Sequence, residues 1–258
     1  MKAFDKIVAE TAEIAGYLWE KGWAERNAGN ISVNVTGLFP EKEIAFLKRS
    51  PPEKLPFAVR PSLEGQVFMV TCKDSRMRDL ARDPLSHLCF VYIQKGQKGY
   101  IRQSARNRQP TSELPTHLAI HDFLLVSQPE NKVVLHTHAL ELVAMTQNPQ
   151  FKSALAINRL LWGMHPETAM FVPRGTGFVP FMLPGTEKIA RATLKELRKH
   201  SVVIWEKHGV LAVGHTIADA FDSIDILARS ARIWFTCRNA GFNPEGLSPE
   251  QQTKIRKK

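Results

Sequence analysis

The alternation of apolar and polar residues predicts a chain that mixes helices with strands. Apolar side chains recur at three- and four-residue steps through residues 3–22, the period of an amphipathic helix. Asn27-Ala28-Gly29-Asn30 then interrupts the helix, and residues 31–35 alternate as a strand does. Further strands are expected at about 66–71, 88–93, 99–103, 132–138, 201–205 and 209–213.

Longer periodic stretches predict the remaining helices. They cover residues 115–126, about 139–163, 186–200 and 218–240. Pro115 suits a first helical turn, where its missing N–H is not needed, and Gly241 suits a helix end. Short extended pieces are expected around 169–182. Residues 38–65 hold five prolines and are expected to form a long loop or excursion.

This order of elements predicts the fold class. Helices and strands do not alternate regularly enough for a doubly wound parallel sheet, and neither repeats nor shifts in composition mark a second domain. We therefore expect an α/β fold in which residues 1–258 form a single catalytic domain. Its central sheet should be mostly antiparallel, with helices on both faces.

Composition narrows the class of protein. Apolar residues make up 43% and charged residues 23%, as in ordinary globular enzymes. No apolar run approaches the ~20 residues of a membrane helix, and the N-terminus does not resemble a signal peptide. The three cysteines are far apart and odd in number, so they predict no disulfide framework. A cytoplasmic enzyme without a membrane partner is expected.

The positive charge changes this picture little. A net charge of +10 attracts polyanions in general. Apart from the cluster Arg102, Arg106 and Arg108 and the tail 254–258, however, the basic residues are dispersed, and no nucleic-acid-binding motif is present. We expect no nucleic-acid partner, and a solvated surface that attracts phosphorylated metabolites.

His136-Thr137-His138 is the first candidate for chemistry. It follows the apolar run 133–135, so both histidines leave the same side of one expected strand, about 6–7 Å apart. Two converging imidazoles suit Zn²⁺ or a similar ion, although two ordinary histidines at a strand end fit the spacing equally well. His208, at a turn before Gly209, is a candidate third ligand. Three histidines leave a coordination position open for water or substrate.

Two polar segments allow a functional and a structural interpretation. Glu113 lies in Pro110-Thr111-Ser112-Glu113-Leu114-Pro115, where it is either part of a helix cap or a general base beside a metal. Asn27, Gly29 and Asn30 form either an ordinary polar turn or a cradle for an anion. His87, His117, His121, His200 and His215 have no partner that can be placed from the sequence, so surface or capping positions are expected for them.

Together these motifs resemble the class II aldolase/adducin-head family. The matching stretches follow one another in order over nearly the whole chain. They are KGWAERNAGN at 21–30, PTSELP at 110–115, HTHA at 136–139, FVPFMLPGT at 178–186 and HSVVIWEKHGV at 200–210. Any one of them is a weak signal, whereas the ordered set is highly specific.

The resemblance implies a set of site residues. It implies one Zn²⁺ per subunit, held by His136, His138 and His208, with Glu113 as the acid/base residue. The implied phosphate and substrate contacts are Asn27, Gly29, Asn30, Thr71, Lys73, Thr111 and Ser112. Glu167 would enter the active site of a neighbouring subunit, in a fourfold-symmetric homotetramer.

One loop departs from the family pattern. After the expected strand that ends at Thr71, the family usually has a Gly-Ser-Gly-type loop that helps to bind phosphate. This chain has Cys72-Lys73-Asp74-Ser75 instead. Lys73 either supplies a point charge in place of backbone donors or faces solvent, with its charge offset by Asp74.

The resemblance also implies an activity. It points to metal-dependent retro-aldol cleavage of L-rhamnulose 1-phosphate into dihydroxyacetone phosphate and L-lactaldehyde, with the cation as Lewis acid. The Thr-Ser-Glu-Leu-Pro segment favours this substrate. Alternatives are cleavage of fuculose 1-phosphate, epimerisation of a pentulose phosphate, or a non-catalytic binding module of the adducin-head type.

Overall fold

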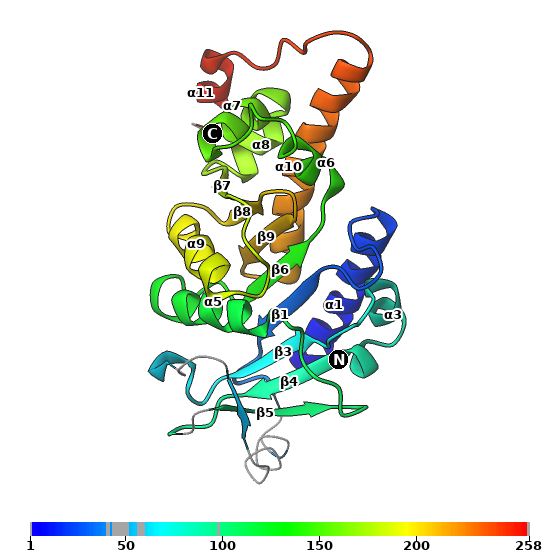
Figure 1. The fold of residues 1–258 in the computed structure, drawn as a ribbon, viewed down its shortest axis with the longest axis vertical. Helices are drawn as coiled ribbons and strands as arrows, with labels where there is room; N and C mark the ends of the chain where they lie inside the picture. The colour runs from blue at the N-terminus through cyan, green and yellow to red at the C-terminus, as the bar shows by residue number, and fades with distance from the viewer. Residues whose placement is uncertain (1, 40–41, 43–51, 56–59, 97–98, 257–258) are drawn as a thin grey trace.

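One mostly antiparallel sheet runs through the computed structural model of the chain (Figure 1). The structure describes residues 2–39, 42, 52–55, 60–96 and 99–256. Within these residues the sheet has nine strands in the order β2-β5-β4-β3-β1-β6-β9-β8-β7, and all neighbours are antiparallel except β7 and β8. The strands are β1 Asn30–Asn34, β2 Glu53–Lys54, β3 Val67–Thr71, β4 Leu88–Tyr92, β5 Gly99–Ser104, β6 Val133–Thr137, β7 Thr176–Val179, β8 Val202–Trp205 and β9 Gly209–Gly214.

Helices cover both faces of the sheet. They are α1 Ala3–Glu20, α3 Met77–Arg82, α4 Pro84–His87, α5 Leu114–Ser127, α6 Leu140–Met145, α7 Ala154–Met164, α8 Pro166–Phe171, α9 Glu187–Leu197, α10 Ile217–Asn239 and α11 Pro249–Arg256, with the 3-10 turn η1 Pro61–Leu63. α1 and α10 pack together on one face, and α5 and α9 lie on the other (Figure 1). The expected fold class is confirmed. No helix in the described part of the chain is long and apolar enough to cross a bilayer.

The predicted single helix over 139–163 is wrong. α6 ends at Met145, and α7 begins only at Ala154. Pro149 disfavours helical geometry at Asn148, whose side-chain oxygen instead accepts a hydrogen bond from the Gln150 N–H. Ser153 then caps α7 by accepting from the Ala156 N–H. Local turn chemistry therefore outweighs the apolar periodicity.

Other differences lie in short elements. α3, α4 and α11 were not expected. α8 occupies 166–171 and overlaps the start of the stretch 169–182, where extended pieces were expected, because Pro166 starts a helix there. The basic tail is helical up to Arg256. Most of the excursion expected over 38–65 lies outside the described residues, and its described parts include β2 and η1. The last two residues of the tail also lie outside the described residues.

The alternation along β6 fixes which face receives the first histidine. Val133 and Leu135 belong to the large core cluster that includes residues of α1 and α10, whereas Val134 belongs to the cluster under α5 and α9. His136 follows this alternation and points to the α5 side, and Asn30 of β1 pairs with it in register. The C-terminal ends of β3 and β6 thus meet the N-terminal ends of β1 and β9 at one edge of the sheet.

We expect this central strand to be sensitive to truncation. Leu135→Ala removes a fully buried side chain and should lower the free energy of unfolding by about 2–5 kcal/mol, because it leaves a cavity between β6 and the helices. Leu155→Ala is the matched control, since Leu155 is exposed on α7, and it should change stability by less than about 0.5 kcal/mol. Urea unfolding of both variants measures the difference, and equal losses would contradict this placement of the core.

Candidate active site

A cavity of about 210 Å³ opens at the sheet edge where β1, β3, β6 and β9 meet. Its lining contains every residue that the sequence predicted for the site except Glu167. The lining residues are Asn27, Ala28, Gly29, Asn30, Thr71, Cys72, Lys73, Asp74, Ser75, Thr111, Ser112, Glu113, His136, His138 and His208. Segments far apart in sequence therefore meet here.

Three imidazoles converge on one side of this cavity. His136 lies near the end of β6, His138 follows that strand, and His208 lies in the turn before β9. The ring centroids are 5.0–5.3 Å apart. One nitrogen from each ring lies within 4.8 Å of those of the other two rings. The arrangement could hold one metal ion.

Hydrogen bonds orient two of the rings. His136 Nδ1 lies 3.0 Å from the Val210 carbonyl oxygen, which only accepts, so Nδ1 carries the proton and Nε2 keeps a free lone pair. His138 Nδ1 lies 2.7 Å from Glu25 Oε1, which leaves its Nε2 free in the same way. Carboxylate and carbonyl partners of this kind commonly orient histidine ligands of metals. Glu25 was not among the predicted residues.

Burial favours the uncharged form of two of the rings. Burial lowers the pKa of His136 well below 6.5, and the nearby rings of His138 and His208 lower it further. Burial also lowers the pKa of His208. Its Nδ1 is buried and has no hydrogen-bond partner among the described residues. Neutral imidazoles are the form that binds metals, so the donor set fits a divalent cation such as Zn²⁺.

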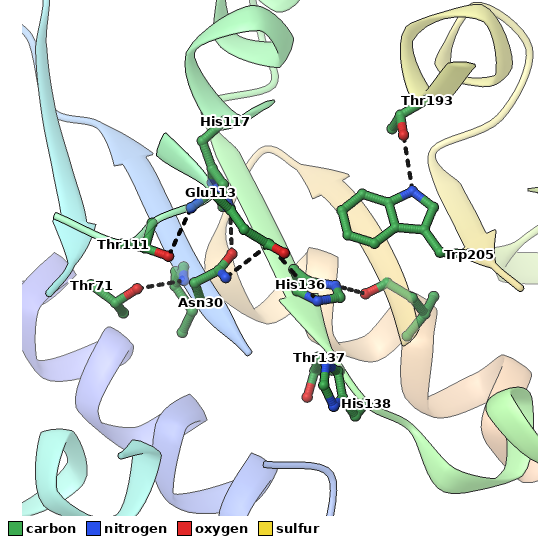
Figure 2. A network of polar contacts seen from close by, with 12 residues as sticks. Asn30, Thr71, Thr111, Glu113, His117, His136, Thr137, His138, Thr193 and Trp205 are labelled. Carbon is green, nitrogen blue, oxygen red and sulfur yellow. Dashed lines mark hydrogen bonds and ion pairs between the residues drawn. The ribbon is translucent and has the colours of Figure 1, made fainter. Parts of the chain in front are cut away.

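The Trp205 ring packs against the histidine cluster. It packs against His136 and His208, with centroid separations of 4.6 and 5.1 Å. The indole N–H donates to Thr193 Oγ1 of α9 at 2.9 Å (Figure 2). The turn that carries His208 has a second anchor, because the Lys207 N–H donates to Thr146 Oγ1 at 2.8 Å. Lys207 adopts a left-handed backbone with φ 59° in this turn.

Two glycines allow the strands to approach one another. A Cβ on Gly209 would lie 2.6 Å from the Thr137 carbonyl oxygen and 2.8 Å from His136 Cε1. Gly29 has a φ of 80°, and a Cβ there would lie 2.9 Å from the His136 carbonyl oxygen. Only glycine fits at both positions without displacing the backbone or rings that carry the cluster.

Glu113 reaches the cluster from the opposite wall. It stands at the beginning of α5, and Figure 2 shows its carboxylate between Asn30 and His136. Glu113 Oε2 lies 3.9 Å from His136 Nε2 and accepts a hydrogen bond of 3.0 Å from Asn30 Nδ2. The Glu113 side chain does not cap the helix. Instead Thr111 Oγ1 accepts from the Glu113 N–H at 3.3 Å, so the carboxylate is free to face the cavity.

The predicted anion cradle forms the rest of the wall. Asn27 Nδ2 approaches Asp74 Oδ1 at 3.5 Å. Lys73 lines the cavity and is also exposed to solvent. Arg108 Nη2 donates to the Lys73 carbonyl oxygen at 2.7 Å and holds the loop in place. Cys72, Asp74 and Ser75 also line the cavity and had been noted only as a departure from the family pattern.

The prediction that His117 and His121 occupy surface or capping positions is wrong. Both are fully buried on α5, one turn apart, and both face Ser32 of β1. Ser32 Oγ lies 2.7 Å from His117 Nδ1 and 2.8 Å from His121 Nε2. The i,i+4 spacing of two histidines opposite the polar positions of β1 was the available signal. It could not be used without knowing that α5 covers β1.

Glu167 does not reach this cavity within the chain. It lies in the first turn of α8, half exposed, with Oε2 3.0 Å from His165 Nδ1. Its expected entry into a neighbouring subunit's site therefore stays a prediction.

The chain is similar to known proteins in both sequence and fold. Residues 9–235 match the family described as Class II Aldolase and Adducin N-terminal domain. The chain belongs to this family. A protein of Bacteroides thetaiotaomicron named rhamnulose-1-phosphate aldolase is 44% identical over 98% of this chain and 94% of its own length. One of the same name from Pectobacterium atrosepticum is 30% identical over 93% and 89%.

Solved structures agree with this assignment. The crystal structure of a sugar-phosphate aldolase from Thermotoga maritima has a TM-score of 0.75 and 30% identity, and the match covers 94% of this chain and 99% of that one. An L-fuculose 1-phosphate aldolase has a TM-score of 0.63 at 15% identity, covering 98% of this chain and 95% of that one, which supports the fold alone. The family and the class II aldolase fold are thus established for this chain.

Gly209→Ala should weaken metal binding, because the added Cβ would push against both the Thr137 backbone and the His136 ring. We expect at least a tenfold loss of Zn²⁺ affinity, the range seen when the supports of a metal ligand are removed. Gly16→Ala is the control, since Gly16 lies inside α1 and a Cβ there makes only an ordinary contact with Ala81 of α3. Titration of the metal-free proteins with Zn²⁺ measures the effect, and equal affinities in both variants would contradict it.

The buried histidines should make stability depend on pH. Burial lowers the pKa of His117 to about 4 and of His121 to about 3, from 6.5. The unfolded chain therefore binds protons first, so stability is full above pH 6.5 and falls as the pH drops below it. Each ring should cost roughly 1 kcal/mol between pH 7.5 and 5.5. Urea unfolding at both pH values should show a smaller drop for His121→Gln, and an unchanged drop would refute the assignment.

Proposed function

We propose that the protein is a zinc-dependent L-rhamnulose-1-phosphate aldolase, which releases dihydroxyacetone phosphate and L-lactaldehyde. One observation carries the proposal. The ligand nitrogens of His136, His138 and His208 lie within 4.8 Å of one another, and the Glu113 carboxylate lies 3.9 Å from the nearest ring. The two relatives named rhamnulose-1-phosphate aldolase match nearly the whole length of this chain.

The Glu113 carboxylate is a proton donor and acceptor beside the three histidines. When bound, a divalent cation supplies the Lewis acid that stabilises negative charge on substrate oxygens as a carbon–carbon bond breaks. In cleavage the C4 hydroxyl loses its proton, the C3–C4 bond breaks and L-lactaldehyde leaves. Glu113 then delivers a proton to C3, which gives dihydroxyacetone phosphate, and it removes that proton in the direction of synthesis. Since its backbone and not its side chain is used in the helix start, the carboxylate can do so without loosening α5.

The opposite wall would receive the phosphate. Asn27, Gly29, Thr111 and Ser112 offer amide, backbone and hydroxyl donors, and Thr71 and Lys73 extend this wall. A Schiff base is not needed, and the lysine that lines the described cavity, Lys73, is exposed to solvent. A desolvated nucleophilic amine would be expected in that mechanism.

We further propose a homotetramer in the cytoplasm, with Glu167 reaching into the site of a neighbouring subunit. Its position on α8, outside the cavity of its own chain, is compatible with that role. Fuculose 1-phosphate and pentulose phosphates are the competing substrates within the family, and the identity to proteins named for rhamnulose favours rhamnulose. The intact triad argues against a non-catalytic adducin-head-like module.

The proposal is tested by turnover of the three sugar phosphates before and after metal removal. We expect cleavage of L-rhamnulose 1-phosphate that EDTA abolishes and Zn²⁺ restores, and no inactivation by borohydride with substrate. Glu113→Gln should lower kcat by about 10²–10⁴-fold, because it removes the proton-transfer group, while bound zinc remains. An EDTA-resistant enzyme trapped by borohydride would overturn the mechanism, and a preference for fuculose or pentulose phosphate would overturn the substrate.

A further inference from the structure

A continuous line of buried hydrogen bonds leads from the core to Glu113. It begins at His121 Nε2, which lies 2.8 Å from Ser32 Oγ, and continues 2.7 Å from that oxygen to His117 Nδ1. His117 Nε2 then contacts Asn30 Oδ1, and Asn30 Nδ2 contacts Glu113 Oε2 at 3.0 Å (Figure 2). All five side chains are buried.

The chemistry of the groups fixes the direction of every proton in this line. Glu113 Oε2 accepts, so the Asn30 amide must donate to it and turn its own oxygen toward His117. That oxygen can only accept, so His117 Nε2 carries a proton. Because burial holds the pKa of His117 at about 4, the ring is neutral near pH 7 and its Nδ1 is an acceptor.

The remaining links follow in the same way. Ser32 must donate its hydroxyl proton to His117 Nδ1, and its oxygen then accepts from His121 Nε2. Every donor therefore points toward the carboxylate, and each bond polarises the next because the side chains are buried. Flipping the Asn30 amide would place two oxygens face to face at Glu113. The His117 tautomer prevents this flip, because its Nε2–H needs the amide oxygen.

We propose that His117 is a positioning residue for Glu113. It acts through Asn30, and Ser32 and His121 complement its tautomer with Nε2 protonated. The line anchors Glu113 Oε2 and leaves Oε1 as the oxygen free for proton transfer. It also assigns the Asn30 side-chain amide to the carboxylate and not to the substrate phosphate, for which the sequence had predicted it. This inference rests on the proposed function, in which Glu113 moves the proton at C3.

A kinetic comparison separates positioning from structural support. His117→Leu removes the donor to Asn30 while the metal ligands and the phosphate wall stay intact. We expect kcat for L-rhamnulose 1-phosphate to fall by about 10–100-fold, part of the 10²–10⁴-fold that a placed acid/base group contributes, with KM and zinc content unchanged. His117→Gln keeps an N–H near the position of Nε2 and should recover most of kcat.

Two further variants complete the comparison. Ile120→Ala opens a cavity in the same helix, on a fully buried residue of the α9-side core, and should leave kcat unchanged although it also destabilises the fold. Asn30→Ala should lower kcat with an unchanged KM, whereas a phosphate role for the amide would raise KM. A His117→Leu variant as active as Ile120→Ala, or Asn30→Ala that changes only KM, would overturn the inference.

A spectroscopic test does not depend on turnover. In ¹⁵N-histidine-labelled metal-free protein at pH 7.5, the signals that are lost in His117→Gln should show Nε2 protonated and Nδ1 bare. Protonation at Nδ1 instead would refute the hydrogen-bond line, whatever the substrate. Wild-type protein that fails to cleave L-rhamnulose 1-phosphate but shows the expected tautomer would count against the proposed function and not against this line.

Discussion

The convergence of three imidazoles at the edge of the sheet is the constraint that the rest of the site depends on. Two of them come from one strand end and the third from a turn that is distant in sequence, so they meet only because β6 and β9 are paired. The absence of a side chain at Gly209 lets that turn pass against the two rings. The Trp205 ring packs against the rings of His136 and His208 and restricts the space in which they can move.

The Glu113 carboxylate beside these rings is held by partners that are themselves buried. Glu113 is held by Asn30, Asn30 by His117, and His117 by Ser32, on a face between β1 and α5 where apolar packing would be the default. Such an interior is tolerated only when each donor finds an acceptor. The wall that we propose for the substrate phosphate has the opposite character, since Lys73 and Asp74 are exposed, and contacts from the distant residues Asn27 and Arg108 shape the loop. The site thus joins a rigid side with a solvated one.

Most of the strands could be predicted from the sequence, because β1, β6, β8 and β9 carry apolar runs with clear ends. The ligand candidates could also be proposed, since the His-x-His spacing on a strand places two rings on one face. The structure brings His136, His138, His208 and Glu113 into one cavity, which spacing alone left undecided.

What could not be predicted depends on tertiary contacts. The helix break at Asn148 follows from a turn whose hydrogen bond competes with the apolar period. His117 and His121 are buried because α5 covers β1. The pattern of residues along one chain does not show which helix packs on which strand. Glu25 contacts His138, and Asp74 contacts Asn27. Both partners come from distant segments, so no local motif predicted these contacts. Comparison with relatives, and not periodicity, connects the chain to aldolases.

The contact between Thr146 and Lys207 bears on when during folding the metal site matures. Once α6 has ended, Thr146 uses its hydroxyl to hold the backbone of the turn that presents the third ring. β6 and the residue after it contribute only two imidazoles, those of His136 and His138, and two ligands are too few for a tight tetrahedral site. The three ligands lie together only when the hairpin of β8 and β9 is paired with β6, so full affinity for the ion requires the native topology, and binding of the ion in turn stabilises that topology.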